Sequence, residues 1–400
     1  MGKAKRAHRP APHGHGAFRA FAHPTGREQM TRMTFDERLK AICGGMEARG
    51  LDLILATHDG AHFIETPNPV TVLSGFKSLG PAICLMDRAG ATTLIVAPPW
   101  DAERAQTLCP KARVIGVDDV VAGLVAALPK SGKPAIGTAG LAFAPFGLAR
   151  RITELVPDAV AADDVVFDAA ARKTDDEIAW AREATRIAEL DYQHLLETAR
   201  PGMSEDELAT EMRWHSKSLG AEDNFVLLCA SPHNRAVAPS NGRRIRDGDI
   251  ILAEITPSFR GQLAQICRTM VVGTAGDLLR RKYALVVEAM NAGIVAAAPG
   301  ARMADVCGAV NAVLERQGYG EYCHPPHIRR RGHGLGFASM RPGDVALDNA
   351  TVLEPGMVFM IHPNQYLPET GYLLCGEPVV ITGTRAEPLT RRQAALAELR

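Results

Sequence analysis

The side chains best suited to acid–base chemistry lie in the second half of this chain. One carboxylate, one amide and two imidazoles stand out: Glu254, Gln265, His333 and His362. An imidazole shuttles protons near neutral pH, and a carboxylate can act as a general base for water or as the partner of a cationic nitrogen. An amide side chain both donates and accepts hydrogen bonds, so it can orient an amide or urea group. Together they provide proton transfer and substrate orientation if the fold brings them into one pocket.

Each of these side chains belongs to a patterned segment. Residues 248–269 begin with a Gly-Asp turn before an apolar run, residues 332–336 read Gly-His-Gly-Leu-Gly, and residues 353–363 end in Ile-His-Pro. In order and spacing, after a helix that opens at Thr174, these segments resemble the creatinase/prolidase/methionine aminopeptidase superfamily. The resemblance covers residues 35–385.

The resemblance implies an α+β fold in two domains. The family's catalytic domain has the pita-bread fold, and we expect it over residues 171–400. A smaller α/β domain of the creatinase/prolidase type is expected before it, over residues 34–170. Residues 1–33 are basic and rich in Pro, Gly and His, without hydrophobic periodicity, which predicts a disordered tail.

The family's peptidases carry two metal ions on two Asp, one His and two Glu. The resemblance places these five positions, in order, on Glu254, Gln265, His333, His362 and Gly376, or Glu377 if the last strand is shifted by one residue. Two neighbouring divalent ions need several anionic ligands to offset their mutual repulsion. This set offers one or two negative charges, so we expect no metal cofactor. The alternative is one divalent metal such as Mn, Zn or Fe on Glu254, His333 and His362.

Several further side chains are candidates for binding the substrate. The two auxiliary histidines of the peptidases are absent, because their positions fall near Val237 and on Met340. The sequence offers nearby or charged replacements: His233, His327, Arg331, Arg341 and Glu377. The run of arginines at 329–331 is either a solvated loop or a guanidinium fork for a carboxylate. Cys267 shares a strand face with Gln265, and is either a packed thiol or a nucleophile.

Three functions compete for this site. Creatinase and ectoine hydrolase, within the same family, cleave C–N bonds without metal, which implies a metal-independent hydrolase of an amide, urea or amidine-type bond in a small molecule. A metal-dependent Xaa-Pro dipeptidase or aminopeptidase is the first alternative. A non-catalytic binding protein with the pita-bread fold is the second. The first is favoured because the replaced ligand positions keep ionisable side chains.

Composition restricts the partners. Lys+Arg 45 equals Asp+Glu 45 over 400 residues, and a chain without excess positive charge is a poor nucleic-acid binder. No apolar run approaches the ~18 residues of a membrane span. The eight cysteines form no CxxC pair, which favours reduced thiols and a cytoplasmic location. The resemblance implies a homodimer in which the N-terminal domain, through the loop that contains His62 and Glu65, closes the neighbouring active site.

The elements that must position these residues follow from periodicity. In the first domain, helices are expected at 35–50, 101–108 and 118–128, and strands at 51–56, 72–76, 82–86, 92–97, 113–116 and 134–137. In the second, capping boxes at Thr174 and Ser204 predict two helices. Further helices are expected at 276–298 and 303–318, and strands at 224–230, 249–256, 264–273, 332–339, 357–362 and 372–382.

Overall fold

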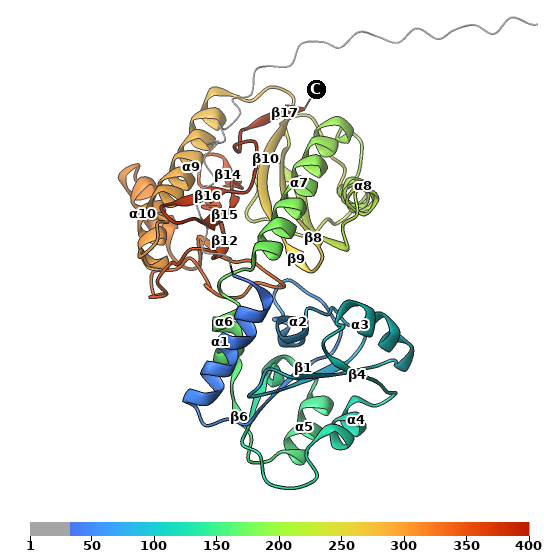
Figure 1. The fold of residues 1–400 in the computed structure, drawn as a ribbon. Coiled ribbons are helices and arrows are strands. Elements are labelled where there is room, and N and C mark those ends of the chain that lie inside the picture. The colour runs from blue at the N-terminus through green and yellow to red at the C-terminus, as the bar shows by residue number, and fades with distance from the viewer. Residues whose placement is uncertain (1–32, 400) are drawn as a thin grey trace, which may run out of the picture.

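The computed structural model describes residues 33–399 of the chain. Figure 1 shows two units joined at a narrow junction, the N-terminal unit in blue to teal and the C-terminal unit in green to red. The predicted tail at 1–33 lies outside the described residues except for Met33, whose carbonyl accepts a hydrogen bond from the Asp175 amide. Among the helices of the described part, none is long and apolar enough to cross a membrane.

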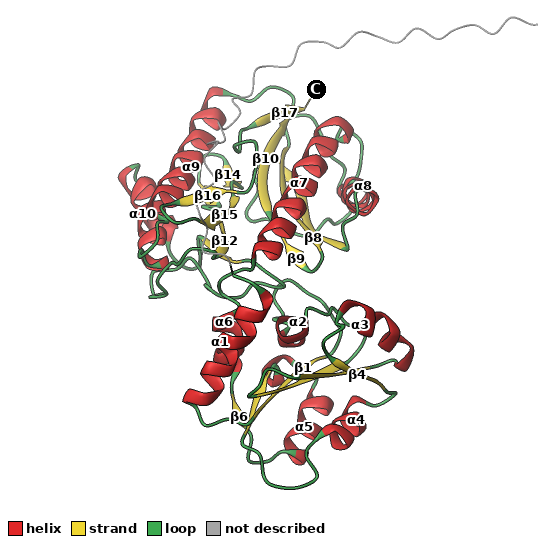
Figure 2. Ribbon diagram, viewed as in Figure 1, coloured by secondary structure: helices red, strands yellow, loops and turns green. Residues whose placement is uncertain are grey.

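The N-terminal unit is a mixed six-stranded sheet with helices on both faces (Figure 2). Its strand order is β4-β3-β2-β1-β5-β6; β1 and β3 pair with β2 in antiparallel fashion and the other pairs are parallel. The strands are β1 (Leu53–His58), β2 (Ala82–Asp87), β3 (Thr92–Val96), β4 (Arg113–Gly116), β5 (Ile136–Ala139) and β6 (Val160–Ala161). The helices are α1 (Phe35–Ala48), α2 (Pro69–Ser74), α3 (Ala102–Leu108), α4 (Val120–Ala127), α5 (Phe146–Leu155) and α6 (Asp163–Ala169).

The strand predicted at 72–76 is wrong, because residues 72–74 belong to helix α2, which Gly75 ends. The Asn68 side chain accepts a hydrogen bond from the Thr71 amide, and Pro69 occupies the first helical position. Gly75 ends the helix with φ 74°, a left-handed conformation that glycine adopts without steric cost. The apolar residues at 72–76 suggest a strand, but the Asn-Pro start of the segment determines its conformation.

The C-terminal unit contains two larger sheets, each covered by a pair of helices, as the predicted pita-bread fold requires, and a two-stranded sheet of β13 and β14. The first sheet has the order β17-β10-β8-β7, with β9 paired to β8; the second has the order β11-β12-β15-β16. The helices are α7 (Asp175–Thr198), α8 (Glu205–Ser218), α9 (Asp277–Ala296) and α10 (Met303–Arg316). The strands are β7 (Asp223–Ser231), β8 (Ile250–Phe259), β9 (Gln262–Leu263), β10 (Ile266–Val272), β11 (Gly332–Gly334), β12 (Val358–Ile361), β13 (Gln365–Leu367), β14 (Gly371–Leu373), β15 (Glu377–Ile381), β16 (Ala386–Pro388) and β17 (Ala397–Leu399).

Both predicted capping boxes are present. Thr174 and Ser204 each accept a hydrogen bond from the amide three residues on, and Glu177 and Glu207 bond back to the cap amides. The strands predicted at 332–339 and 372–382 are shorter than expected, because glycine-rich turns interrupt them. Residues 332–334 form β11, and the second segment divides into β14 and β15.

A buried ion pair between Arg38 and Glu177 connects the two units. Arg38 of α1 is fully buried, and its Nη1 donates to Glu177 Oε1 at 2.6 Å. Glu177 also accepts from the Thr174 amide, so one carboxylate caps α7 and binds the N-terminal unit. A buried pair of this kind costs several kcal/mol when only one partner is removed. The junction therefore fixes the loop of the N-terminal unit relative to the cavity described next.

Candidate active site

The four side chains predicted for chemistry line one cavity of about 400 Å³. Glu254 lies on β8 and Gln265 directly precedes β10, whereas His333 is the centre of β11 and His362 directly follows β12. An antiparallel bridge between Cys267 and Gly376 joins the first sheet to the second. Because the two sheets meet there, residues more than a hundred positions apart face each other.

A chain of hydrogen bonds crosses this cavity. Gln265 Nε2 donates to Glu254 Oε1 at 2.8 Å and lies 3.2 Å from Thr256 Oγ1. On its other side Gln265 Oε1 lies 3.0 Å from His333 Nε2, and His333 Nδ1 lies 3.0 Å from the Gly334 carbonyl oxygen. A neutral imidazole donates from one nitrogen only, so His333 donates either to Gln265 or to Gly334. The amide thus connects the protonation states of Glu254 and His333.

Burial shifts the pKa values of these groups toward their neutral forms. It raises the pKa of Glu254 to about 7, although the positive charge of Arg330 acts in the opposite direction. It lowers the pKa of His333, and it lowers that of His362 well below 6.5, with the neighbouring His333 adding to the effect. Both imidazoles are neutral at pH 7, and Glu254 is the group that gains or loses a proton there.

The glycines beside His333 are required by close backbone contacts. A Cβ atom on Gly334 would collide with the carbonyl of Met340, and one on Gly332 would collide with the carbonyl of Met360. Gly332 also has a backbone φ of 150°, an angle that L residues with a side chain rarely adopt. Adjacent segments therefore hold the His333 backbone on both sides and aim its ring into the cavity.

Cys267 does not have the features of a nucleophile. Its side chain is fully buried, and Sγ lies 3.8 Å from Glu254 Oε2. Burial and the neighbouring carboxylate raise the pKa of this thiol well above 9.0, so it stays protonated at neutral pH.

None of the five side chains predicted to bind the substrate lines the cavity. Arg331 is buried, where its Nε donates to Asn311 Oδ1 at 2.7 Å and its Nη1 donates to the Pro363 carbonyl. Arg341 donates to Asp168 Oδ1 at 2.7 Å, in the N-terminal unit. Both guanidinium groups are engaged in contacts within the protein.

The other three predicted residues also have partners elsewhere. Glu377 accepts from the Ala394 amide at 2.9 Å and forms an ion pair of 3.0 Å with the buried Arg268. His233 Nε2 lies 3.0 Å from the Pro368 carbonyl oxygen. The ring of His327 contacts that of Tyr322, with centroids 4.8 Å apart. Because of these contacts, none of the three side chains lines the cavity.

Three charged residues that were not predicted as site residues lie at the cavity instead. Arg329 and Arg330, rather than Arg331, line it, and Glu65 reaches it from the N-terminal unit. The loop residues Phe63, Ile64 and Glu65 close the cavity of their own chain. The closure of a neighbouring subunit's site by this loop stays a prediction, because only one chain is described. The arginine run was a usable signal, but the sequence did not indicate which members face inward.

The residues that line the cavity differ from those needed by the pair of metal ions that the family resemblance implies. Glu254 and Glu65 are the two carboxylates among the residues that line it, and Glu65 forms an ion pair with Arg330. A Cβ atom at Gly376 would lie 2.6 Å from His362 Cβ, so no longer side chain fits at the last ligand position. In the described part of the chain, no three His, Cys, Asp or Glu side chains converge as metal ligands. These residues do not fit two divalent ions.

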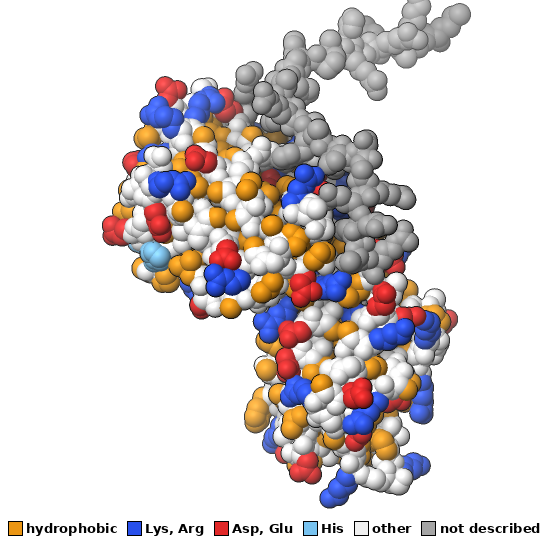
Figure 3. All heavy atoms as spheres, turned by 60° about the vertical axis from the view of Figure 1, so that its left-hand side comes forward, with side chains coloured by type: hydrophobic (Ala, Val, Ile, Leu, Met, Phe, Trp, Pro, Cys, Tyr) orange, Lys and Arg blue, Asp and Glu red, His pale blue; other side chains and the backbone are white. Residues whose placement is uncertain are grey.

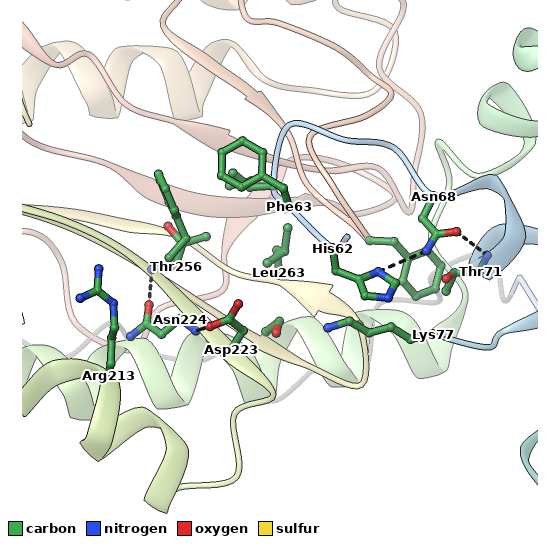
Figure 4. Close-up of a pocket in the computed structure, with 15 residues that line it drawn as sticks. His62, Phe63, Asn68, Thr71, Lys77, Arg213, Asp223, Asn224, Thr256 and Leu263 are labelled. Atoms are coloured by element: carbon green, nitrogen blue, oxygen red, sulfur yellow. Dashed lines mark hydrogen bonds between the residues drawn. The ribbon is translucent and has the colours of Figure 1, made fainter. Parts of the chain in front are cut away.

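A second cavity, of about 260 Å³, is drawn in Figure 4. It adjoins the first, because Phe63, Ile64 and Phe225 line both. The register of β7 and β8 pairs Leu227 with Glu254 in the first cavity and Asp223 with Ser258 in the second. The N-terminal unit contributes His62 and Lys77 to this cavity, opposite Asp223 (Figure 4). A substrate longer than the first cavity can therefore extend into the second.

The exclusion of nucleic acid as a partner stays a prediction from the net charge of the chain. Lys, Arg, Asp and Glu side chains are interspersed over the face that Figure 3 shows, without a continuous basic area. A nucleic-acid interface needs clustered positive charge to neutralise phosphates. This agrees with the net charge of +0.

Comparison with known proteins gives a consistent result. Residues 179–383 match the family model described as metallopeptidase family M24. The chain is 26% identical, over 90% of its length and 99% of the relative's, to a Xaa-Pro dipeptidase of Pyrococcus furiosus. Its fold is similar to that of the prolidase from Pyrococcus horikoshii, with a TM-score of 0.78, 23% identity, and coverage of 90% of this chain and 99% of the other. The Xaa-Pro dipeptidase from Bacillus anthracis gives a TM-score of 0.78 at 22% identity, covering 92% and 100%.

Proposed function

The chain belongs to metallopeptidase family M24, and from this premise we propose that it is a peptidase that hydrolyses the amide bond of dipeptide-sized substrates of the Xaa-Pro type. The observation that carries the proposal is the cavity in which Glu254, Gln265 and His333 form one hydrogen-bonded chain. The similarity to a Xaa-Pro dipeptidase over both units supports the choice of substrate class.

The sequence prediction of a metal-independent hydrolase of small amides, ureas or amidines is contradicted by these matches. The matched family is one of metallopeptidases, and the full-length relatives are named Xaa-Pro dipeptidase and prolidase. The expectation of no cofactor is contradicted by the same family match. The first alternative, an Xaa-Pro peptidase, is the one they favour. The donor set described above remains a departure of this chain from a two-metal site.

The cavity's own residues support specific roles in amide hydrolysis. Glu254 accepts or releases a proton near neutral pH, because its pKa is about 7. Gln265 holds the Glu254 carboxylate at a fixed distance from the His333 ring, so both groups are oriented before substrate binds. Neutral His333 and His362 can donate or accept single hydrogen bonds to the substrate amide.

The apolar wall of the cavity suits a proline ring. Phe63 and Phe225 meet edge to face with centroids 5.5 Å apart, and Leu227 and Val237 continue the wall. A proline ring buries apolar surface and its amide nitrogen donates no hydrogen bond, so such a wall leaves no polar group of the ring unpaired.

We also propose the homodimer and the cytoplasmic location inferred from the sequence. Support for the location comes from the eight cysteines, which are all free thiols and, apart from Cys43, buried. Light scattering after size-exclusion chromatography tests the dimer, and a mass of one chain would refute it.

The direct test is release of proline from Xaa-Pro dipeptides by the purified full-length protein, with and without added Mn²⁺. We expect proline release by the wild type and its loss in the His333→Ala and Glu254→Gln variants. Arg341→Met is the matched control, because Arg341 lies away from the cavity. Equal proline release by the wild type and His333→Ala would refute the site. If no protein releases proline, with or without Mn²⁺, the non-catalytic alternative would be favoured.

A further inference from the structure

A third cavity, of about 180 Å³, lies between helix α10 and the segments that precede and follow β11. Helix α10 contributes Cys307 and Asn311, and the arginine run at 329–331 contributes all three members. None of the four side chains predicted for chemistry lines this cavity, so it is separate from the catalytic one. Asp348 is the only carboxylate among its lining residues, which leaves the cavity with an excess of positive charge.

The guanidinium of Arg331 has an unmet hydrogen bond at this cavity. Arg331 is 1% exposed; its Nε donates to Asn311 Oδ1 at 2.7 Å, and its Nη1 donates to the Pro363 carbonyl. Its Nη2 has no hydrogen-bond partner among the described residues. A buried donor that is left unpaired costs free energy. Because Arg331 lines the third cavity, a ligand in that cavity can supply the missing acceptor.

The charge of Arg331 also lacks an anionic partner. Two other arginines of the described part are buried, and each forms an ion pair with a buried glutamate: Arg38 with Glu177 and Arg268 with Glu377. The partners of Arg331 are neutral amide and carbonyl oxygens. A buried charge without a counter-charge is unfavourable, and an anion bound beside it offsets that cost.

The two thiols near Arg331 do not supply the missing charge. Cys307 and Cys323 both line the cavity and lie close enough to act on the pKa of Arg331, which burial lowers. Burial raises the pKa of Cys307 to about 11 and raises that of Cys323 as well. Both thiols are therefore protonated at neutral pH, and a thiol is only a weak hydrogen-bond acceptor.

The remaining charged side chains at the cavity favour a small anion. Arg329 is exposed at the rim and adds a second guanidinium. Arg330 adds positive charge, but its two terminal nitrogens donate to Asp344 and Glu65. Asp348 is exposed and leaves the excess of positive charge in place. Guanidinium groups match the oxygen atoms of phosphate, and a cavity of about 180 Å³ has room for a small oxyanion.

We propose that the third cavity is a binding site for a small tetrahedral oxyanion, inorganic phosphate, which accepts hydrogen bonds from Arg331 Nη2 and from Arg329. The backbone of Arg331 lies between the two catalytic histidine segments: its amide donates to the Val345 carbonyl at 2.7 Å, and its carbonyl accepts from the His362 amide at 2.9 Å. His333 follows two residues later. Phosphate bound to Arg331 therefore stabilises the part of the fold that holds these histidines.

Calorimetry and thermal unfolding of the full-length protein test this site, in a buffer free of phosphate and sulfate. We expect inorganic phosphate to bind with a Kd of about 1 mM. At 50 mM it should raise the Tm by about 2–3 °C relative to sodium chloride of equal ionic strength. Arg331→Met should abolish both effects, Arg329→Met should weaken binding about fivefold, and Asp348→Asn should tighten it about threefold. Arg341→Met, whose guanidinium is bonded to Asp168 away from this cavity, is the matched control.

Three results would overturn the inference. The first is an equal effect of phosphate and chloride on the wild type. The second is unchanged phosphate binding by Arg331→Met that retains the circular dichroism of the wild type. If that variant does not fold, unchanged binding in both Arg329→Met and Asp348→Asn is the third.

Further anions identify the chemistry of the ligand. Acetate as effective as phosphate would overturn the choice of a tetrahedral anion. Tighter binding of glycerol 3-phosphate than of inorganic phosphate would support the site and assign it to a phosphate monoester. None of these measurements requires turnover, so they decide the anion site whether or not the protein releases proline from dipeptides.

Discussion

Replacing Glu254 with glutamine should make the protein more stable in alkaline solution and leave its stability unchanged in acid. Glutamine keeps the size of the side chain and its acceptor for Gln265 Nε2, which now lies 2.8 Å from Glu254 Oε1. It removes only the ability to carry a negative charge. The difference between the two proteins therefore isolates the cost of that charge in the cavity.

The magnitude follows from the shift in pKa. Burial raises the pKa of Glu254 from 4.5 to about 7 in the folded protein, so the folded state binds this proton more tightly than the unfolded state. Stability is then lost as pH rises from about 4.5 through about 7. At 1.36 kcal/mol per unit the full cost is at most ~3 kcal/mol, and ~2 kcal/mol is expected with solvent screening in an open cavity.

Urea denaturation at pH 4 and at pH 8.5 measures this difference. At pH 4, where Glu254 is protonated in the folded state and mostly protonated in the unfolded state, the two proteins should unfold at nearly the same urea concentration. At pH 8.5 the midpoint of Glu254→Gln should be higher by about 1 M, for a slope of roughly 2 kcal/mol per M. Glu288→Gln, an exposed carboxylate on α9, is the matched control and should stay within about 0.5 kcal/mol at both pH values. A pH-independent difference, or a lower midpoint for Glu254→Gln at pH 8.5, would refute the reasoning.

Three more perturbations test the junction, the histidine segment and the ligand set. Arg38→Ala leaves its carboxylate partner buried and unpaired, so urea midpoints should report a loss of about 3–5 kcal/mol, against less than ~1 kcal/mol for Arg49→Ala in an exposed pair. Gly334→Ala should abolish soluble folded protein or peptidase activity, because its new Cβ atom would collide with the carbonyl oxygen of Met340. Gly44→Ala has open space around it and should retain the circular dichroism and activity of the wild type. Normal activity in Gly334→Ala would contradict the geometry. After incubation with Mn²⁺ and removal of free ions, elemental analysis should find fewer than two ions per chain, and two would contradict the charge argument.

The order of elements in the C-terminal unit was predictable because local signals agree with the tertiary structure. The capping boxes at Thr174 and Ser204 start α7 and α8, as their spacing predicts. The strand prediction for residues 72–76 failed because a run of β-branched residues is compatible with both strand and helix. The N-cap at Asn68 starts a helix there instead.

The candidate site was predictable only in part. The placement of Glu254, Gln265, His333 and His362 in one cavity follows the family pattern. At the last ligand position, a shift of one residue moves a strand side chain to the opposite face. The structure leaves Gly376 against His362 and turns Glu377 to Arg268, a choice that the sequence left open.

The sequence by itself determined the order of most helices and strands, because capping boxes, glycine-rich turns and apolar periodicity are local properties. Its resemblance to a known family determined the fold class and the types of side chain in the cavity. Only the tertiary structure decided which charged residues meet there. The arginine run at 329–331 has no helical or strand period to orient it, and Glu65 reaches Arg330 across 265 positions of the chain. Contacts between distant segments depend on how the two units pack, and no local pattern encodes that packing.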